Sequence, residues 1–258
     1  MHFYTKTATG IEPRHFVTQK NDPTKQRASR TSDAKAALKA GEKWYASVTT
    51  ILGVLDKPAL ISWKIDQHLK TVFEGNNSLE GHCDFDSFAR HIKALTEARL
   101  DEAPKAGTNI HNVLEKYFRD SVIPDDEIEL KICKNVEAVL LENCGKQEWE
   151  YEKYFVDEER GFAGCADLVS LEWVVDYKSK QEAVKFKPGK MAYPEHSRQL
   201  GAYAHGFKIL LPKAANIFIC LENGEVDFHR HCADDICNGW FDFSDCLNIF
   251  ERNTYDPA

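Results

Sequence analysis

The stretch GFAGCADLVSLEWVVDYKS, residues 161–179, decides the fold, because it predicts two β-strands joined by a tight turn. Small and apolar residues alternate through its first half, and a β-branched and aromatic run precedes Asp176, as is typical of a buried strand. Side chains alternate faces along a strand, so Asp176 and Lys178 share one face. Together with Asp167 on the neighbouring strand, they can form a group of two carboxylates and one lysine at the strand ends.

This group of charges has two interpretations. Aspartate is depleted from strands, and a charge beside a buried strand needs a partner or a metal ion. Carboxylate oxygens suit Mg²⁺ or Mn²⁺, and a lysine can stabilise charge on a phosphate or orient an attacking water. The other interpretation is an ordinary ion pair between Asp176 and Lys178 on an exposed edge strand.

Length and composition indicate a globular protein. The chain has 258 residues, of which 43% are hydrophobic and 29% charged, enough for one large domain or two small ones. No apolar run approaches the ~18 residues of a membrane span, and no apolar segment follows Lys6 as it would in a signal peptide. The eight cysteines, without a secretory signal, favour reduced thiols in a cytoplasm.

The charge is spread unevenly along the chain. The net charge of −8 argues against a protein that coats nucleic acid non-specifically. Residues 1–45 nevertheless hold nine Lys and Arg against four Asp and Glu, whereas the rest of the chain holds 24 against 37. We expect this segment to be a basic, weakly structured arm, which serves either a polyanionic ligand or simply a solvated surface.

The order of predicted elements indicates an α/β protein. Helices are predicted over residues 34–40, 49–73 with a break near 57–58, 86–99, 108–118, 126–144, 196–208 and 234–253, and a loop over 75–81. Strands are predicted over residues 149–156, 162–171, 173–178, 215–221 and 226–231. Helices followed by two hairpins that alternate with helices predict a mixed sheet flanked by helices.

Three features of the helical half leave alternatives open. The hydroxyls of Ser47 and Thr49 can cap the following helix or bind phosphate oxygens at its N-terminus. Thr108 is a candidate N-cap, which places His111 and Glu115 one turn apart on one helix face, where the histidine is either structural or a metal ligand. Trp63 is either a core residue or a platform on which a base stacks.

Several motifs occur in a fixed order. They are His111, Glu152, Asp167, Asp176-Tyr177-Lys178 and Gln199-x-x-x-Tyr203, and Ser47-Val-Thr49-Thr-Ile precedes Gly107-Thr108-x-x-His111-x-x-Leu-Glu115. In this order they resemble the PD-(D/E)XK nuclease superfamily and, within it, the RecB-like exonuclease branch. The second set is similar to phage-encoded exonucleases and to the mitochondrial genome maintenance exonuclease. The resemblance covers roughly residues 45–205.

The resemblance implies a fold and a division of the chain. The fold is a restriction-endonuclease-like mixed central sheet flanked by helices, with an N-terminal helical extension. After the arm of residues 1–45, a single nuclease domain is expected over 46–258, with a helical part over 46–145 and the catalytic sheet core over 146–258.

The resemblance also implies roles for individual residues. The metal ligands are His111, Asp167, Asp176 and the backbone carbonyl of Tyr177. The catalytic set is Lys178 with Asp167 and Asp176, with Gln199 and Tyr203 lining the site and Glu152 on the preceding strand. The residues expected to contact DNA are Ser47, Thr49, Thr108, Lys180, Lys185 and Lys187, the last three in a lysine-rich segment after the site.

The implied activity is that of a metal-dependent DNA exonuclease. We expect Mg²⁺, with Mn²⁺ as a substitute, and a substrate that is single-stranded DNA or a DNA end. Phage-type recombination, replication or repair, beside a single-strand-binding or annealing protein in a bacterial host cytoplasm, is the implied setting. The alternatives are a structure-selective endonuclease of the same fold and a non-catalytic nucleic-acid-binding member.

Some relatives of this branch carry an iron–sulfur cluster, with one cysteine before the histidine motif and three after the Gln/Tyr helix. Here Cys83 precedes His111, and Cys232, Cys237 and Cys246 follow the helix. On one helix, Cys237 and Cys246 lie more than two turns apart and cannot converge. The spacing therefore favours buried free thiols over a cluster.

Overall fold

The computed structural model describes residues 2–19, 22–55, 58–74, 84–100 and 102–255. The chain divides into two compact units, Met1–Leu55 with Val113–Ala258, and Asp56–Asn112. Helix α5 (Glu102–Asp120) is continuous through the boundary between the two units.

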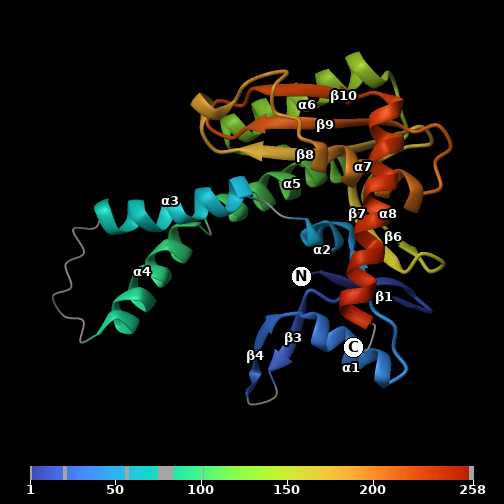
Figure 1. Cartoon of the computed structure of the whole chain (residues 1–258). Helices are drawn as coiled ribbons and strands as arrows, with labels where there is room; N and C mark the ends of the chain where they lie inside the picture. The colour runs from blue at the N-terminus through green and yellow to red at the C-terminus, as the bar shows by residue number, and fades with distance from the viewer. Residues whose placement is uncertain (1, 20–21, 56–57, 75–83, 101, 256–258) are drawn as a thin grey trace. The chain divides into compact units, whose positions relative to one another are not determined.

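The first unit is built on one eight-stranded sheet (Figure 1). Its strands are β1 (Phe3–Thr7), β2 (Gly10–Pro13), β5 (Tyr45–Ser47), β6 (Glu150–Asp157), β7 (Phe162–Val169), β8 (Trp173–Lys180), β9 (Lys213–Cys220) and β10 (Val226–His231). The order is β10-β9-β8-β7-β5-β1-β2, and β6 pairs with β7. The β5–β7 and β8–β9 pairs are parallel and the others antiparallel. A mixed sheet flanked by helices confirms the predicted fold class.

Two faces of the sheet are covered by helices from different parts of the chain. The helices are α6 (Glu127–Cys144), α7 (Pro194–Gly206) and α8 (Ala233–Tyr255). Asp176 and Lys178 of β8 point toward α7, while Tyr177 points the other way, toward Cys133 of α6. Strand β8 lies between β7 and β9, so the interpretation of Asp176 and Lys178 as an exposed edge pair is wrong.

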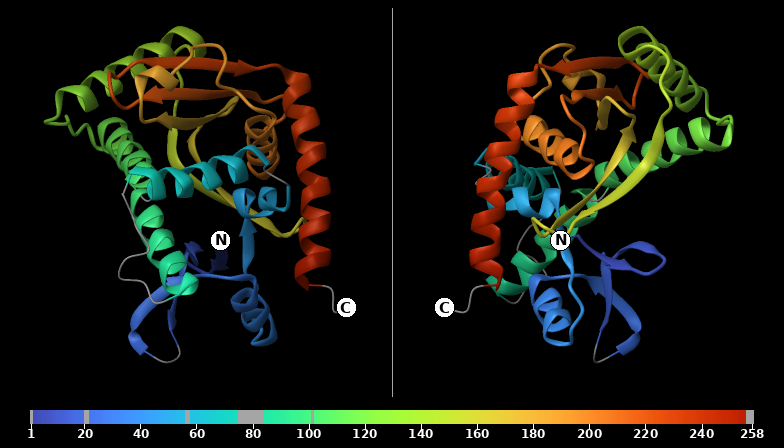
Figure 2. Two further views of the ribbon diagram at one scale, coloured as in Figure 1. Left: turned by 60° about the vertical axis from the view of Figure 1, so that its left-hand side comes forward. Right: turned by 90° about the vertical axis from the view of Figure 1, so that its right-hand side faces the viewer.

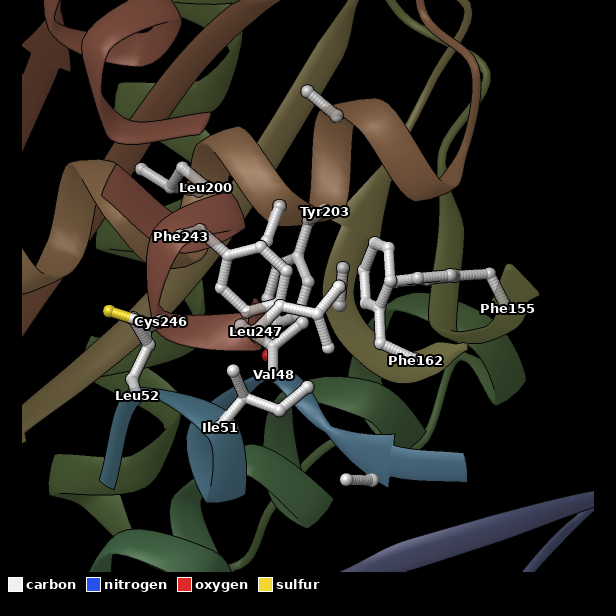
Figure 3. Close-up of a cluster of buried hydrophobic side chains, with 14 of the residues drawn as sticks. Val48, Ile51, Leu52, Phe155, Phe162, Leu200, Tyr203, Phe243, Cys246 and Leu247 are labelled. Carbon is white, nitrogen blue, oxygen red and sulfur yellow. The ribbon is translucent and has the colours of Figure 1, made fainter. Parts of the chain in front are cut away.

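The main hydrophobic core lies between the sheet and the α7–α8 pair. Helix α2 (Val48–Ile51) and the short 3₁₀ helix η1 (Leu52–Val54) contribute to it. In Figure 3, Val48 and Ile51 meet Tyr203 of α7 and Phe243 and Leu247 of α8. Residues that are separated by about 200 positions in the sequence thus share one core, which holds α7 against the strands that carry the charged group.

Helices α7 and α8 cross very closely, side by side in both views of Figure 2. A Cβ atom at Gly239 would lie 2.4 Å from the backbone oxygen of Ser197, and one at Gly201 would lie 2.7 Å from the backbone oxygen of Ile236. Side-chain carbons essentially never approach backbone atoms so closely. The crossing therefore requires glycine on both helices.

The segment 1–45 is structured, contrary to expectation. Strand β1 pairs with both β2 and β5 in the main sheet, and Phe3 is fully buried. Strands β3 (Phe16–Gln19) and β4 (Asp22–Ala28) form a separate hairpin, which precedes helix α1 (Thr31–Lys39). The prediction of a weakly structured arm was wrong because β1 is ordered by pairing with β5, a contact that local sequence pattern does not reveal.

Helix α6 lies within one residue of the predicted range of 126–144. The side chain of Asp126 accepts hydrogen bonds from the backbone N–H groups of Ile128 and Glu129, both at 2.9 Å, and so caps α6. Gly145 ends the same helix with a φ of 69°, a conformation that favours glycine. One signal was wrong: α5 begins at Glu102, so Thr108 lies inside the helix and is not its N-cap.

The second unit contains α3 (Pro58–Glu74) and α4 (Phe85–Leu100), near the predicted positions. The hydroxyl of Thr96 donates to that of Thr71 at 3.1 Å and joins the two helices. The predicted loop at 75–81, Cys83 and the side chains of Trp63 and Thr108 lie outside the described residues. Within the described part of the chain, every helix is too short or too polar to cross a membrane.

Candidate active site and metal centre

The site is built around a break in the pairing of β6 with β7. Tyr151 pairs with Leu168 and Lys153 with Ala166, so Glu152 lies opposite Asp167, where the ladder is interrupted. The backbone of Glu152 has a φ of 44°, in the left-handed region that a residue with a side chain rarely adopts. Such conformations cluster at functional sites, because the surrounding structure must hold them in place.

The left-handed conformation of Glu152 changes the face of the sheet to which the following side chains of β6 point. Tyr151 stacks on Phe118 of α5, with ring centroids 5.9 Å apart and planes at 6°. Phe155, four residues further along β6, packs against Tyr203 of α7 on the other face, with ring centroids 6.1 Å apart. Residues four apart in a regular strand share a face, so the reversal takes place between them, at Glu152.

Three side chains can hold a metal ion at this break. Donor atoms of His111, Glu152 and Asp167 all lie within 4.8 Å of one another. Two ligands on opposite sides of a magnesium ion are about 4.2 Å apart, because each Mg–O bond is about 2.1 Å. An imidazole and two carboxylates this close together can therefore converge on one divalent cation.

Helix α5 is held beside this group by contacts to β6. Arg119 donates a hydrogen bond to the backbone oxygen of Tyr151 at 2.6 Å, next to Glu152, and also pairs with Glu115. Glu115 lies one helical turn after His111, on the same face of α5. Helix α5 thus carries both the imidazole of His111 and the side chain of Arg119, which binds the helix to β6.

Neighbouring groups orient the two carboxylates. The thiol of Cys165 donates to Oε2 of Glu152 at 3.2 Å. Burial, together with the charge of Glu152, raises the pKa of Cys165, so the thiol stays protonated and remains a donor. The backbone N–H of Tyr177 donates to Oδ2 of Asp167 at 2.5 Å, which joins β7 to the Asp176-Tyr177-Lys178 segment of β8.

Asp176 and Lys178 form a second part of the site. Asp176 is 5% exposed, and its Oδ2 lies 2.6 Å from Nζ of Lys178. The side-chain amide of Gln199 bonds to both, donating to Oδ1 of Asp176 at 2.9 Å and accepting from Lys178 at 2.9 Å. Its Nε2 also donates to the hydroxyl of Tyr203 at 2.8 Å. The four residues that were predicted to lie together are therefore in direct contact.

The charges around Lys178 keep it protonated. Burial lowers the pKa of Lys178, but the carboxylate of Asp176, helped by that of Asp167, outweighs burial, and the net effect raises this pKa. For Tyr203, burial and the nearby Asp176 raise the pKa of the phenol far above its usual range, so it stays neutral. At neutral pH the site therefore holds Lys178 as a cation and Tyr203 as a neutral phenol.

The resemblance implied His111, Asp167 and Asp176 as metal ligands, and the structure brings Glu152 together with the first two. A ligand role for Asp176 stays a prediction. The oxygens of Asp176 are held by Gln199 and Lys178, and also by Asn216. Glu152 was predicted to lie in the site without a defined role. The positive φ that turns it toward Asp167 leaves no signal in the sequence.

Two further residues of the site were missed. Asn216 of β9 donates to Oδ2 of Asp176 at 3.0 Å, and its own carbonyl oxygen bonds to His231 of β10 at 2.8 Å. The sequence does contain a signal for Asn216, because this amide interrupts an apolar strand, Ala214-Ala-Asn-Ile-Phe-Ile-Cys220. A buried polar side chain in such a strand needs a partner.

Of the two hydroxyls at the start of α2, that of Ser47 caps the helix. The Oγ of Ser47 accepts a hydrogen bond from the N–H of Thr50 at 3.1 Å, which confirms the capping interpretation, and Ser47 is buried. Thr49 is exposed, and its hydroxyl lies 3.1 Å from that of Ser47. A contact of either hydroxyl with DNA stays a prediction.

The lysine-rich segment after β8 is partly packed. Phe186 and Met191 are buried against Phe218 of β9 and anchor the segment on the sheet. Lys180 is half-buried, Lys187 is exposed, and Lys185 pairs with Glu182 at 2.6 Å. Their role in DNA binding stays a prediction.

The cysteines near the C-terminus occupy different environments. Cys237 is exposed and Cys246 is buried, both on α8, and the sulfur of Cys232 accepts a hydrogen bond from the N–H of Asp235 at 3.4 Å. Because Cys83 lies outside the described residues, the four cysteines cannot be compared as a set.

Comparison with protein-family models finds no match, and comparison with curated proteins finds none. Among solved structures, the chain is similar to a protein of Eubacterium rectale described as a "putative exonuclease", with a TM-score of 0.40, 10% identity, and 58% of this chain covered. The match spans 66% of that protein, just under two thirds of its length. A protein named SSO0001 matches with a TM-score of 0.27 and 12% identity, over 57% of this chain and 74% of the other. At these TM-scores, neither likeness defines the fold or activity of this chain.

Proposed function

We propose that this protein is a metal-dependent nuclease that hydrolyses phosphodiester bonds in DNA. The observation that carries the proposal is the closeness of two groups of residues, which are joined by the hydrogen bond from the N–H of Tyr177 to Asp167. One is the set of His111, Glu152 and Asp167, whose donors are spaced for one divalent ion. The other is the buried pair of Asp176 and Lys178.

The chemistry of this arrangement fits phosphoryl transfer. A divalent ion, Mg²⁺ or Mn²⁺, supplies an activated water and stabilises charge on the phosphate when it is bound. Asp167, Glu152 and His111 would hold this ion, and the carboxylate of Asp176 on β8 would complete its ligands. Lys178, which stays protonated, would donate hydrogen bonds to the attacking water or to a phosphate oxygen, and Gln199 would fix its direction.

Within this class we propose an exonuclease that acts on single-stranded DNA or on DNA ends. The motif order that resembles the RecB-like branch supports this narrower assignment. The exposed Lys187 and the half-buried Lys180, on the segment that leaves the site, offer cations for the DNA backbone. A protein with a net charge of −8 must bind DNA through such a local patch. The phage-type recombination setting and an annealing or single-strand-binding partner belong to the same proposal.

Linear and circular substrates distinguish the possible activities. We expect the protein to degrade linear, end-labelled single-stranded DNA in Mg²⁺ and to leave closed-circle single-stranded DNA intact. The position of the released label then gives the polarity. Cleavage of circles would replace the exonuclease with a structure-selective endonuclease, and DNA binding without hydrolysis in Mg²⁺ or Mn²⁺ would favour a non-catalytic nucleic-acid-binding protein.

A further inference from the structure

The strand β9 places a buried amide directly beside the carboxylate of Asp176. Asn216 is fully buried and pairs with Asp176 in the parallel register of β8 and β9. Its Nδ2 donates to Oδ2 of Asp176 at 3.0 Å and approaches the backbone oxygen of the same residue at 3.2 Å. One amide group thus holds Asp176 by its side chain and its main chain.

The orientation of this amide is fixed from the next strand. Oδ1 of Asn216 lies 2.8 Å from Nε2 of His231, which is 7% exposed. An amide oxygen only accepts hydrogen bonds, so the proton of His231 must be on Nε2. If the amide turned by 180°, its oxygen would face the carboxylate oxygens of Asp176 and its NH₂ would face a donor, with both hydrogen bonds lost.

We infer that Asn216 and His231 are positioning residues, which hold the Asp176 carboxylate in the orientation that binding of a divalent ion at this site requires. The inference rests on the proposed function and deepens it, because it assigns to β9 and β10 the support of a metal-binding carboxylate. Oδ2 of Asp176 is shared between the Nζ of Lys178 and the Nδ2 of Asn216. Without Asn216, the Nζ of Lys178 would direct this oxygen more strongly, and the carboxylate could follow the lysine away from the metal position.

Partners of this kind matter because a metal ligand must be oriented before the ion arrives. Loss of a group that orients a ligand typically lowers metal affinity about 10- to 100-fold. His231 is also a favourable position for a test. It lines a cavity of about 530 Å³, together with His205, Ile236 and Trp240, so a change of its ring has space to be accommodated.

The test is calorimetric titration of the full-length protein with Mn²⁺, and each variant is also checked for its thermal unfolding. His231→Phe keeps a ring and removes the donor, and Asn216→Leu removes the amide. We expect both to weaken Mn²⁺ binding about 10- to 100-fold at an unchanged fold. His231→Gln, which retains an N–H donor, should recover part of the affinity.

His205→Phe is the matched control, because it removes a histidine from the same cavity, where its ring stacks on Trp240 and makes no bond to Asn216. It should bind Mn²⁺ as the wild type does.

A second measurement, which needs no variant, is the ¹⁵N NMR spectrum of the His231 ring, where the proton is expected on Nε2. A neutral ring protonated on Nδ1 would overturn the inference even if both substitutions prevented folding.

The outcomes separate the inference from the proposed function. Folded His231→Phe and Asn216→Leu proteins that bind Mn²⁺ like the wild type would overturn the inference while the nuclease proposal stands. A wild type that binds Mn²⁺ and cleaves no DNA would remove the nuclease, and the affinities of the variants would still decide the inference. A wild type that binds no Mn²⁺ would overturn both.

Discussion

At the scale of single residues, the conformation of Glu152 connects backbone geometry to chemistry. A residue with a side chain pays roughly 1–2 kcal/mol to adopt a left-handed conformation. Here that conformation reverses the strand and places a carboxylate opposite Asp167, next to the thiol of Cys165. The strain is therefore expected to serve the metal site at the expense of stability.

Replacement of Glu152 by glycine and by alanine tests whether the left-handed backbone at this position costs stability. Both substitutions remove the carboxylate and should abolish most metal-dependent activity. Glycine adopts positive φ freely, so Glu152→Gly should be more stable than Glu152→Ala by about 0.5–1 kcal/mol, measured by urea unfolding. In an ordinary strand position the order is reversed, because glycine is the weaker residue there. A more stable alanine variant would show that the left-handed backbone is not retained.

At the scale of elements, local patterns predicted what local interactions stabilise. The ends of α6 were predictable because Asp126 and Gly145 act on their own neighbours. The start of α5 was not predictable. Nor was the fact that β1 is a structured strand, since β1 depends on pairing with the distant β5.

The residues of the site divide in the same way into predictable and unpredictable ones. The contact of Asp176 and Lys178 with Gln199 follows from strand period and motif order. In contrast, Asn216 reaches Asp176, and His231 reaches Asn216, only through the alignment of β8, β9 and β10.

The close crossing of α7 and α8 is the element on which the position of Gln199 depends. Gly239→Ala would place a methyl group 2.4 Å from the backbone oxygen of Ser197, so the helices must separate. We expect a loss of about 2–3 kcal/mol of unfolding free energy in chemical denaturation. Gly53→Ala is the matched control, because its methyl group meets no atom within 4 Å, and it should stay within about 0.5 kcal/mol of the wild type. Equal stability of the two variants would contradict this account of the crossing.

At the scale of the whole molecule, buried histidines couple the sheet core to pH. Burial, with Lys178 nearby, lowers the pKa of His196 to about 3, and burial, with His229 nearby, lowers that of His231 to about 4. In the unfolded chain both titrate near 6.5. Between these values the unfolded state binds more protons than the folded state, so the free energy of unfolding falls as the pH decreases from about 6.5 toward 4. Above pH 7 these two side chains contribute no pH dependence.

A double variant, His196→Gln with His231→Gln, isolates this effect from the titration of carboxylates. Its loss of unfolding free energy between pH 7 and pH 4.5 should be smaller than that of the wild type by at least about 2 kcal/mol. Urea unfolding at a series of pH values measures both curves. Parallel curves for the two proteins would show that neither histidine is held neutral by the fold.

The central claim is that Lys178 and its surrounding carboxylates hydrolyse DNA with the help of a divalent ion. The most direct measurement is single-turnover hydrolysis of linear, end-labelled single-stranded DNA by the wild type, by Lys178→Met and by the control Lys213→Met, which removes a strand lysine paired with the exposed Glu172. We predict hydrolysis by the wild type in Mg²⁺ that chelator abolishes, a rate at least about 100-fold lower for Lys178→Met, and a rate close to the wild type for the control. Hydrolysis that persists in chelator, or that proceeds equally fast without Lys178, would contradict the account.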